Sequence, residues 1–498
     1  MPPPGPRSRR SSPVLRLETG ATTCSLVGTA RLRDVPTEQI GDLSGASLVA
    51  HAGEGRGSSA QGRSSGPNHH SNVAENDTTD WRKATLDSVD VNWIERGLLP
   101  VLRGAASAGL PVTVVVGPRA CGKTTLVRRL VEEGVYQRYV SFADPGVRAA
   151  AAASPLLFVE SLPIGTVIDE AQLVPEVLVP IKETVDATGR PGQFLLTGST
   201  RVDLPTMGGT HPLAGRMASF ELGPLNAAER HGRPATSITT MLEGKPSTLA
   251  VTNLKGVGYD EEATTSGFPL LVTSRANHRR WRRDYLRSVI PETLKESDHA
   301  VDHQRLTRLL DGIAGIAGHE LVLSHLVADL SIDRRTAARY LDLLEEMRLI
   351  RRLPGLRSKA TDTERAVPKL HMVDPILVAP DPAGVSDDRR GALLESLVVN
   401  EFASQLEWVG GTDGLYHWRD RRRDEVDLVI EADRGFIAVE VKRAREVPSN
   451  ATAGINAFRA RYPEQFRRGL VMYAGPHVLP LGDAVWAIPI SALWNAES

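Results

Sequence analysis

A glycine-rich segment carries the residue types that bind nucleotide phosphates. Gly117, Gly122, Lys123 and Thr124 match the pattern G-x-x-x-x-G-K-[ST] in full. The glycines let the backbone turn its N–H groups toward phosphate oxygens, and the helix expected from Lys123 to Leu130 adds its positive N-terminal end. Lys123 is expected to neutralise the β- and γ-phosphates of ATP, and the Thr124 hydroxyl to bind Mg²⁺. The candidate phosphate contacts are Gly117, Pro118, Arg119, Ala120, Cys121, Gly122, Lys123, Thr124 and Thr125.

A pair of acids later in the chain supplies the second half of this chemistry. In "GTVIDEAQ", Asp169 and Glu170 follow a short apolar run, at the end of a predicted strand where ligands collect in parallel sheets. Asp169 is expected to hold Mg²⁺, and Glu170 to activate the attacking water as general base. The alternative is a solvated acidic pair at a helix N-terminus, where negative charge is favoured.

Two further segments could act on the transferred phosphate. "FLLTGST" ends an apolar run in hydroxyl side chains, and either Thr197 or Ser199 could orient the attacking water. Arg216 in "HPLAGR" could stabilise the charge that develops on the phosphoryl group, from its own subunit or from a neighbouring one. The alternatives are a hydroxyl that caps a turn and an arginine in a surface salt bridge.

Charged residues in the last quarter of the chain could form a metal site. Asp427 lies inside the apolar run "EVDLVIE", and "FIAVEVKRA" places Glu440 and Lys442 on one face of the next predicted strand. In a hairpin of these strands the two carboxylates would meet. With a carbonyl or a third acid, for which Glu395 in "GALLESLVVNEFASQL" is the candidate, they would make a hard-oxygen site for Mg²⁺, and the lysine could orient a water.

This D…E-x-K arrangement resembles that of restriction-endonuclease-like nucleases. Arginines suited to phosphate contacts precede Asp427 directly: Arg419, Arg421, Arg422 and Arg423. Two alternatives remain. The charges could form a solvated sheet face, or the fold could bind a partner without performing chemistry.

The ATP-binding residues require a sheet that holds them at one edge. Strands are expected in "VTVVV", "QRYVSFAD", "GTVIDEAQ" and "GQFLLTGST", and helical stretches alternate with them. This alternation predicts a parallel α/β sheet. Residues 231–266, rich in Thr, Ser and Gly, are expected to contain a long loop.

The middle of the chain has the pattern of a winged helix. Two amphipathic helices flank "LSID", with Asp333 as N-cap, and "LIRRLP" would be the first strand of a wing. Arg334, Arg335 and Arg339 near the start of the second helix favour a DNA-binding element. The alternative is a packing domain beside an ATPase core.

The composition limits the remaining possibilities. With 59 basic and 60 acidic residues among 498, the chain is not a general polyanion binder, so any nucleic-acid site must be a local patch. Two cysteines, Cys24 and Cys121, give neither a disulfide framework nor a zinc set. No apolar run approaches the ~18–20 residues that a membrane span needs. A cytoplasmic protein without a membrane partner is expected.

Taken in order, the motifs resemble a known family. "GPRACGKTT", "VIDEAQ", "FLLTGS" and "LAGR" are similar to AAA-type ATPases of bacteria and archaea that carry a C-terminal domain of unknown function. "SGFPLL", "HMVDPIL", "LLESLVVNEF", "EVDLVIE" and "VEVKRA" follow in that family's order. The resemblance covers roughly Trp81 to Trp494 and implies ATP binding and a cytoplasmic location. The N-terminal tail, the Thr/Ser-rich stretch and residues 297–319 depart from it.

The expected fold class is α/β, with four segments. These are a disordered tail (1–80), an AAA-type P-loop ATPase domain with a parallel sheet (81–230), a linker and winged-helix-like region (231–365) and an α/β nuclease-like domain (366–498). The predicted function is a Mg²⁺-dependent ATPase whose nucleotide state switches a nuclease-like domain that acts on or binds nucleic acid. The alternative is an ATP-gated protein-docking or scaffold module. A homo-oligomer is compatible with both.

Overall fold

The computed structural model describes most of the chain from residue 93 onward. The described residues are 93–199, 211–232, 237–251, 258–296, 303–313, 318, 320, 321, 327, 332–356, 367–378, 381, 384–410, 414–432 and 435–497. They all belong to one compact unit, Thr79–Ser498. The predictions for the tail and for order beginning at Trp81 lie outside them. In the described part of the chain, no helix is both long enough and apolar enough to cross a membrane.

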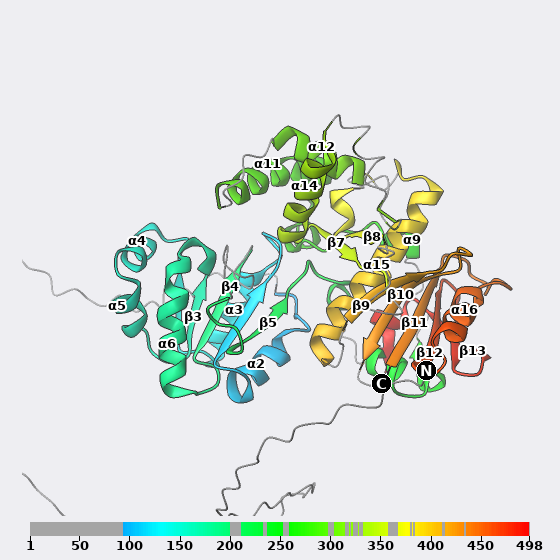
Figure 1. Cartoon of the computed structure of the whole chain (residues 1–498), viewed down its shortest axis with the longest axis horizontal. Helices are drawn as coiled ribbons and strands as arrows, with labels where there is room; N and C mark the ends of the chain where they lie inside the picture. Colours follow the sequence, from blue (N-terminus) through cyan, green and yellow to red (C-terminus); the bar gives the residue numbers. More distant parts are fainter. Residues whose placement is uncertain are drawn as a thin grey trace, which may run out of the picture. The chain divides into compact units, whose positions relative to one another are not determined.

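The first sheet consists of five parallel strands in the order β2-β3-β4-β1-β5 (Figure 1). The strands are β1 (Val112–Val116), β2 (Arg138–Ser141), β3 (Thr166–Asp169), β4 (Phe194–Gly198) and β5 (Met217–Glu221). The predicted parallel sheet is therefore confirmed, with β1 and β4 fully buried as their apolar, β-branched sequences indicate. Strand β5 was not predicted, because "MASFE" at the sheet edge is only partly buried and lacks an apolar run.

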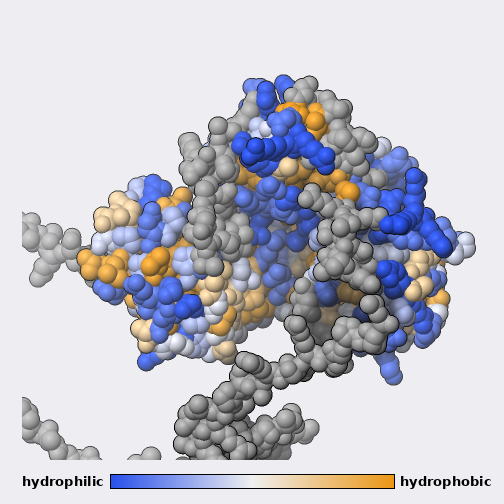
Figure 2. All heavy atoms as spheres, in the orientation of Figure 1, coloured by the Kyte–Doolittle hydropathy of each residue, from blue (hydrophilic) through white to orange (hydrophobic). Residues whose placement is uncertain are grey.

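Helices cover both faces of this sheet (Figure 1). Leu102 of α2 (Leu99–Ala108) and Leu126 of α3 (Lys123–Glu132) pack with Val115 on one face. On the other face, Ile181 of α6 (Leu178–Thr188) packs with Val114. The remaining helices of that face are α4 (Pro145–Ala153), α5 (Pro155–Glu160), η1 (Ala171–Leu173) and η2 (Pro175–Val177). Figure 2 shows hydrophobic surface over this region, where α5 exposes Leu156 and Leu157.

The segment expected to be a long loop contains short elements in its described part. Helix α7 (Ala227–Arg230) precedes the segment, and the elements within it are α8 (Ser237–Leu242), η3 (Pro246–Thr248), β6 (Ala250–Val251) and α9 (Tyr259–Glu262). The loop prediction followed the Thr/Ser/Gly composition and missed the spacing of Ile238, Met241 and Leu242, which lie on one helical face and are buried. Strand β6 pairs with β15 (Ala496–Glu497).

The middle region is helical and ends in two short strands. Its elements are α10 (Pro269–Thr273), α11 (His278–Glu296), α12 (His303–Ile313), α14 (Arg334–Glu346), β7 (Ile350–Leu353), β8 (Lys369–Met372) and η4 (Pro375–Leu377). Asp333 caps α14 by accepting a hydrogen bond from the Thr336 N–H, as predicted. Strand β7 pairs antiparallel with β8. The first helix of the predicted winged helix lies outside the described residues, so that assignment stays a prediction.

The C-terminal sheet has six strands in the order β13-β14-β12-β11-β10-β9. They are β9 (Gly414–Arg419), β10 (Glu425–Ala432), β11 (Gly435–Lys442), β12 (Phe466–Tyr473), β13 (Leu479–Gly482) and β14 (Val485–Pro489). The predicted hairpin is confirmed: β10 and β11 are antiparallel, while β11 and β12 are parallel and joined through α16 (Ala453–Arg461). Helix α15 (Asp387–Val409) packs on one face and α16 on the other, and α17 (Ala492–Asn495) follows β14.

Candidate active site of the ATPase domain

The phosphate-binding loop connects the carboxyl end of β1 to α3. Gly122 precedes α3 with φ 102°, a left-handed conformation that favours glycine. A Cβ on Gly117 would lie 2.0 Å from the Leu222 carbonyl oxygen, so only glycine fits against the segment after β5. These two glycines shape the loop so that its backbone can surround a phosphate. Thr125 is exposed on the first turn of α3.

The Lys123 ammonium is held over this loop by two of its carbonyls. Lys123 Nζ donates to Gly117 O (2.9 Å) and Pro118 O (3.1 Å), and the residue is buried. Both acceptors are neutral carbonyls and not carboxylates. No acidic side chain in the described part of the chain pairs with this ammonium, so its positive charge can attract the β- and γ-phosphates.

Asp169, at the end of β3, accepts hydrogen bonds from three hydroxyl groups. Thr124 Oγ1 and Tyr139 Oη donate to Asp169 Oδ2 over 2.9 Å and 2.7 Å, and Thr197 Oγ1 donates to Oδ1. Burial, followed by the Asp169 carboxylate, raises the pKa of Tyr139 to about 12, so this phenol remains a donor. The structure brings Thr124 and Asp169 together as the predicted Mg²⁺ site requires, and both supply the hard oxygens that this ion prefers.

Glu170 is fixed through its backbone and its side chain. Its φ of 58° is left-handed, which is uncommon for a residue with a Cβ, and its N–H donates to Thr197 Oγ1 over 3.0 Å. The amide of Gln172 donates to both Glu170 Oε2 (2.5 Å) and Ser199 Oγ (3.1 Å). The Thr197 hydroxyl already donates to Asp169, whereas Gln172 bridges the side chains of Ser199 and Glu170. This arrangement favours Ser199 over Thr197 as the residue that orients water.

Arg216 lies at the amino-terminal ends of the strands, on the side of the sheet away from the phosphate-binding loop. Its carbonyl accepts from the N–H of Val112, the first residue of β1, whereas the phosphate-binding loop follows the last residue, Val116. Its guanidinium pairs with Asp186, and that hydrogen bond lowers the pKa of Asp186 to about 2. The structure therefore does not bring Arg216 to the nucleotide site of its own chain; it forms the surface salt bridge that was the alternative.

Arg96 is a buried residue beside the phosphate-binding loop that sequence reasoning missed. Its guanidinium donates to the carbonyls of Cys121 (2.8 Å) and Gly223 (2.8 Å) and to Glu229 Oε1 (3.0 Å). A single arginine before α2 forms no motif, so no local signal could have found it. Cys121 itself is buried, and its Sγ donates to the Leu222 carbonyl.

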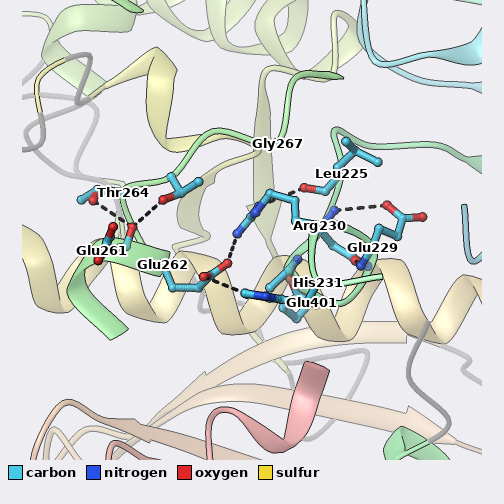
Figure 3. Close-up of polar contacts among 12 residues, drawn as sticks. Leu225, Glu229, Arg230, His231, Glu261, Glu262, Thr264, Gly267 and Glu401 are labelled. Carbon is cyan, nitrogen blue, oxygen red and sulfur yellow. Dashed lines mark hydrogen bonds and ion pairs between the residues drawn. The ribbon is translucent and has the colours of Figure 1, made fainter. Parts of the chain in front are cut away.

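Helix α7 links this loop to α15. Its capping box joins Asn226 and Glu229, and the N–H of Ala227 donates to Glu401 Oε1 on α15 over 2.5 Å. Figure 3 shows Arg230 and His231 of the same segment directed toward Glu262. Burial raises the pKa of Glu401 to about 7.

The C-terminal hairpin brings Asp427 and Glu440 together. Asp427 lies beside the pair Leu428–Val439, its Oδ2 accepts from the Val441 N–H (2.9 Å), and both acids are buried. Lys442 Nζ donates to Glu440 Oε1 over 2.6 Å. Burial and then the Asp427 charge raise the pKa of Glu440 to about 8. The alternative of a solvated sheet face does not hold for these two acids, because both are buried.

A lysine from β8 completes this cluster. Lys369 Nζ donates to Asp427 Oδ1 (2.9 Å) and to Glu395 Oε1 of α15 (3.1 Å). Burial opposes the charge on Asp427, but the Lys369 ammonium outweighs it and lowers the pKa of Asp427. Burial, and then Asp427, raise the pKa of Glu395 well above its ordinary value.

The three acids of this cluster do not converge on one point. Among the described residues, no three or more histidine, cysteine, aspartate or glutamate side chains are grouped so that they could hold a metal ion. Glu395 and Asp427 of the predicted ligand set meet at the Lys369 ammonium, whereas Glu440 pairs with Lys442. Of the predicted phosphate contacts, Arg419 pairs with Glu320, whereas Arg421, Arg422 and Arg423 are exposed after β9.

The parallel sheet and the first site together have the form of a P-loop nucleotide-binding domain. Residues 110–231 match a family model described as an AAA domain. Residues 258–380 and 390–493 match two domains of unknown function, DUF8612 and DUF4143. Uncharacterized proteins of Mycobacterium tuberculosis and Mycobacterium bovis are each 27% identical over 397 residues, covering 78% of this chain and 82% of theirs.

Two solved structures show weaker likeness. The RuvB Holliday junction branch migration motor of Thermotoga maritima is 21% identical, with 52% of this chain and 90% of that chain covered and a TM-score of 0.25. A signal transduction ATPase with a tetratricopeptide repeat sensor from Pyrococcus horikoshii is 10% identical, with 64% and 48% covered and a TM-score of 0.22. At these TM-scores, neither likeness supports a conclusion about this chain.

Proposed function

We propose that this protein hydrolyses ATP and that its nucleotide state is transmitted through α7 to the C-terminal domain. At the first site, Lys123 would hold the β- and γ-phosphates, and Thr124 and Asp169 would hold Mg²⁺. Glu170 would take the proton of the attacking water, and Ser199 would orient that water together with Gln172. Bound Mg²⁺ would supply positive charge to the phosphate oxygens.

A series of buried contacts between the phosphate-binding loop and α15 supports the proposal that the nucleotide state is transmitted. Arg96 joins the Cys121 carbonyl of the phosphate-binding loop to Glu229, which also accepts from the Gly97 N–H over 2.9 Å. Glu229 caps α7, and α7 contacts Glu401 of α15. Charge-assisted hydrogen bonds are strong, and these groups are buried. A shift of the loop on phosphate binding would therefore displace α7 and, through Glu401, the part of α15 that contacts it.

We further propose that the C-terminal domain is nuclease-like and binds nucleic acid. The hairpin with Asp427 and Glu440, the parallel strand β12 and the acid on α15 support this resemblance. The exposed arginines Arg422 and Arg423, in the turn between β9 and β10, are suited to phosphate contacts. The alternative, a domain that docks a protein partner, is favoured by the ammonium group among its carboxylates.

Hydrogen exchange of the full-length protein tests the transmission. Adding a non-hydrolysable ATP analogue is expected to change amide exchange in the part of α15 around Glu401 in the wild type. The change should be lost in Glu229→Gln, which weakens the link to Arg96. Glu262→Gln is the matched control, because Glu262 also partners α7 but has no hydrogen bond to the loop. No nucleotide-dependent change in wild-type α15 would refute the transmission.

Binding of labelled duplex and single-stranded DNA and RNA tests the second part. Affinity is expected to fall as salt rises, because phosphate contacts release counterions. Arg422→Ala combined with Arg423→Ala should weaken binding, whereas ATPase turnover should not change. Absence of binding at low salt, with and without nucleotide, would leave the docking module as the better description.

A further inference from the structure

Lys369 occupies a position that a surface lysine would not take. Its side chain is only 4% exposed, and its ammonium lies between Asp427 of the hairpin and Glu395 of α15. It comes from β8, a strand outside the six-stranded sheet that carries the hairpin. A buried charge is stable only when it is paired, so this ammonium and its two acids depend on one another.

Strand β8 is fastened to α15 along its length. Besides Lys369 and Glu395, His371 Nδ1 lies 3.1 Å from Ser396 Oγ, and Asn400 Nδ2 donates to Met372 O over 2.7 Å. These contacts align successive residues of β8 with one side of α15. They hold the backbone that carries Lys369 against α15, and the ammonium itself is held by its pairs with Asp427 and Glu395.

The hydrogen-bonding capacity of the cluster is largely used. Asp427 Oδ1 accepts from Lys369 and Oδ2 from the Val441 N–H, and Glu440 Oε1 accepts from Lys442. Glu440 Oε2 is buried without a partner among the described residues. A hard divalent cation needs several oxygens converging on one point, so it would have to displace the Lys369 and Lys442 ammonium groups from the oxygens that accept from them.

We propose that Lys369 is the resident cation of this carboxylate cluster and that it excludes divalent metal, so that the C-terminal domain binds its partner without metal-dependent cleavage. The proposal rests on the nuclease-like character proposed above, and it adds that the cluster is neutralised from within. In this arrangement Lys369 does for Asp427 and Glu395 what Mg²⁺ would do in a metal-dependent nuclease.

The test is a titration of the full-length protein with Mn²⁺, without nucleotide and in an Asp169→Asn background that removes the other metal site. Binding is followed by calorimetry and by the spin resonance of free Mn²⁺. The Lys369-containing protein is expected to bind no Mn²⁺ at the cluster. Lys369→Met should bind one Mn²⁺ per chain at the cluster, and adding Asp427→Asn should abolish this binding.

Lys442→Met is the matched control. It removes the other lysine of the cluster and leaves Lys369 in place, so no gain of Mn²⁺ binding is expected. Equal Mn²⁺ binding by Lys442→Met would show that removing any positive charge from the cluster allows metal binding, and it would overturn the proposal. A folded Lys369→Met protein that binds no Mn²⁺ would also overturn it.

If Lys369→Met does not fold, the Lys369-containing protein still decides the matter. If the Lys369-containing protein binds Mn²⁺ and Asp427→Asn removes that binding, the proposal is overturned. If neither this protein nor Lys369→Arg binds Mn²⁺ at the cluster, the proposal is supported. Failure of the proposed function is separately visible. Loss of all nucleic-acid binding would remove that function and leave the Mn²⁺ result unchanged.

Discussion

The carboxyl of Glu401 should make the stability of the protein depend on pH in a defined window. Burial raises its pKa from the ordinary 4.5 to about 7, while the side chain contacts the N–H of Ala227 and the amide of Gln405. A difference of about 2.5 between these pKa values corresponds to about 3 kcal/mol, at about 1.4 kcal/mol for each unit. Glu401→Gln keeps a carbonyl oxygen for Ala227 and cannot ionise.

The direction of the effect follows from which state binds the proton. Below pH 4.5 the carboxyl is protonated in both folded and unfolded chains, so this group does not oppose folding. As the pH rises to about 7, the unfolded chain ionises while the buried carboxyl resists, and the wild type loses stability. Glu401→Gln should therefore match the wild type near pH 4 and exceed it by up to about 3 kcal/mol at pH 8.

Urea unfolding from pH 4 to pH 8 measures this difference. Glu407, whose pKa burial also raises to about 7, contributes its own decline, but this cancels when the variant is compared with the wild type. Glu446→Gln, an exposed position in the C-terminal domain, is the control and should follow the wild type. Parallel stability profiles of Glu401→Gln and wild type across the window would show that burial at this site does not perturb the carboxyl.

Three further predictions concern the nucleotide site. Lys123→Ala should abolish tight ATP binding, whereas Glu170→Gln should bind ATP but turn over at least tenfold more slowly, measured by phosphate release; unchanged turnover would remove Glu170 from its role. Cys121 is buried and donates to a carbonyl, so thiol reagents should label it slowly with or without ATP; rapid labelling that ATP blocks would contradict this. Arg216→Ala should retain turnover, and a loss that grows with protein concentration would indicate that a neighbouring subunit uses this arginine.

The nucleotide site could be predicted because its residues follow from local patterns. Lys123 and Thr124 belong to one short motif, and Asp169 and Thr197 each end an apolar run. The carboxyl ends of parallel strands lie at one edge of a sheet, so predicting the strands was enough to place these residues together. The same reasoning failed for Arg216, because this residue precedes a strand and so lies at the amino-terminal ends of the strands, away from the nucleotide site.

The contacts between distant parts of the chain could not be predicted from any local sequence pattern. Arg96 and Glu229 are 133 positions apart, and Ala227 and Glu401 are 174 apart. Each is a single polar residue in its own segment, and neither periodicity nor motif spacing relates positions that only the tertiary fold brings together. Lys369 was missed for the same reason, since its sequence neighbours gave no hint of acids on α15 and β10.

These missed residues have one physical property in common, and it bears on function. Arg96, Glu229, Lys369 and Glu401 are all buried, where an unpaired charge is costly and a pair tolerates little displacement. A surface arginine could follow a moving loop, but Arg96 is held by two carbonyls and a carboxylate at once. Movement of the phosphate-binding loop must therefore either break these contacts or carry α7 with it. The second course preserves every buried pair, which is why we expect nucleotide binding to act on α15.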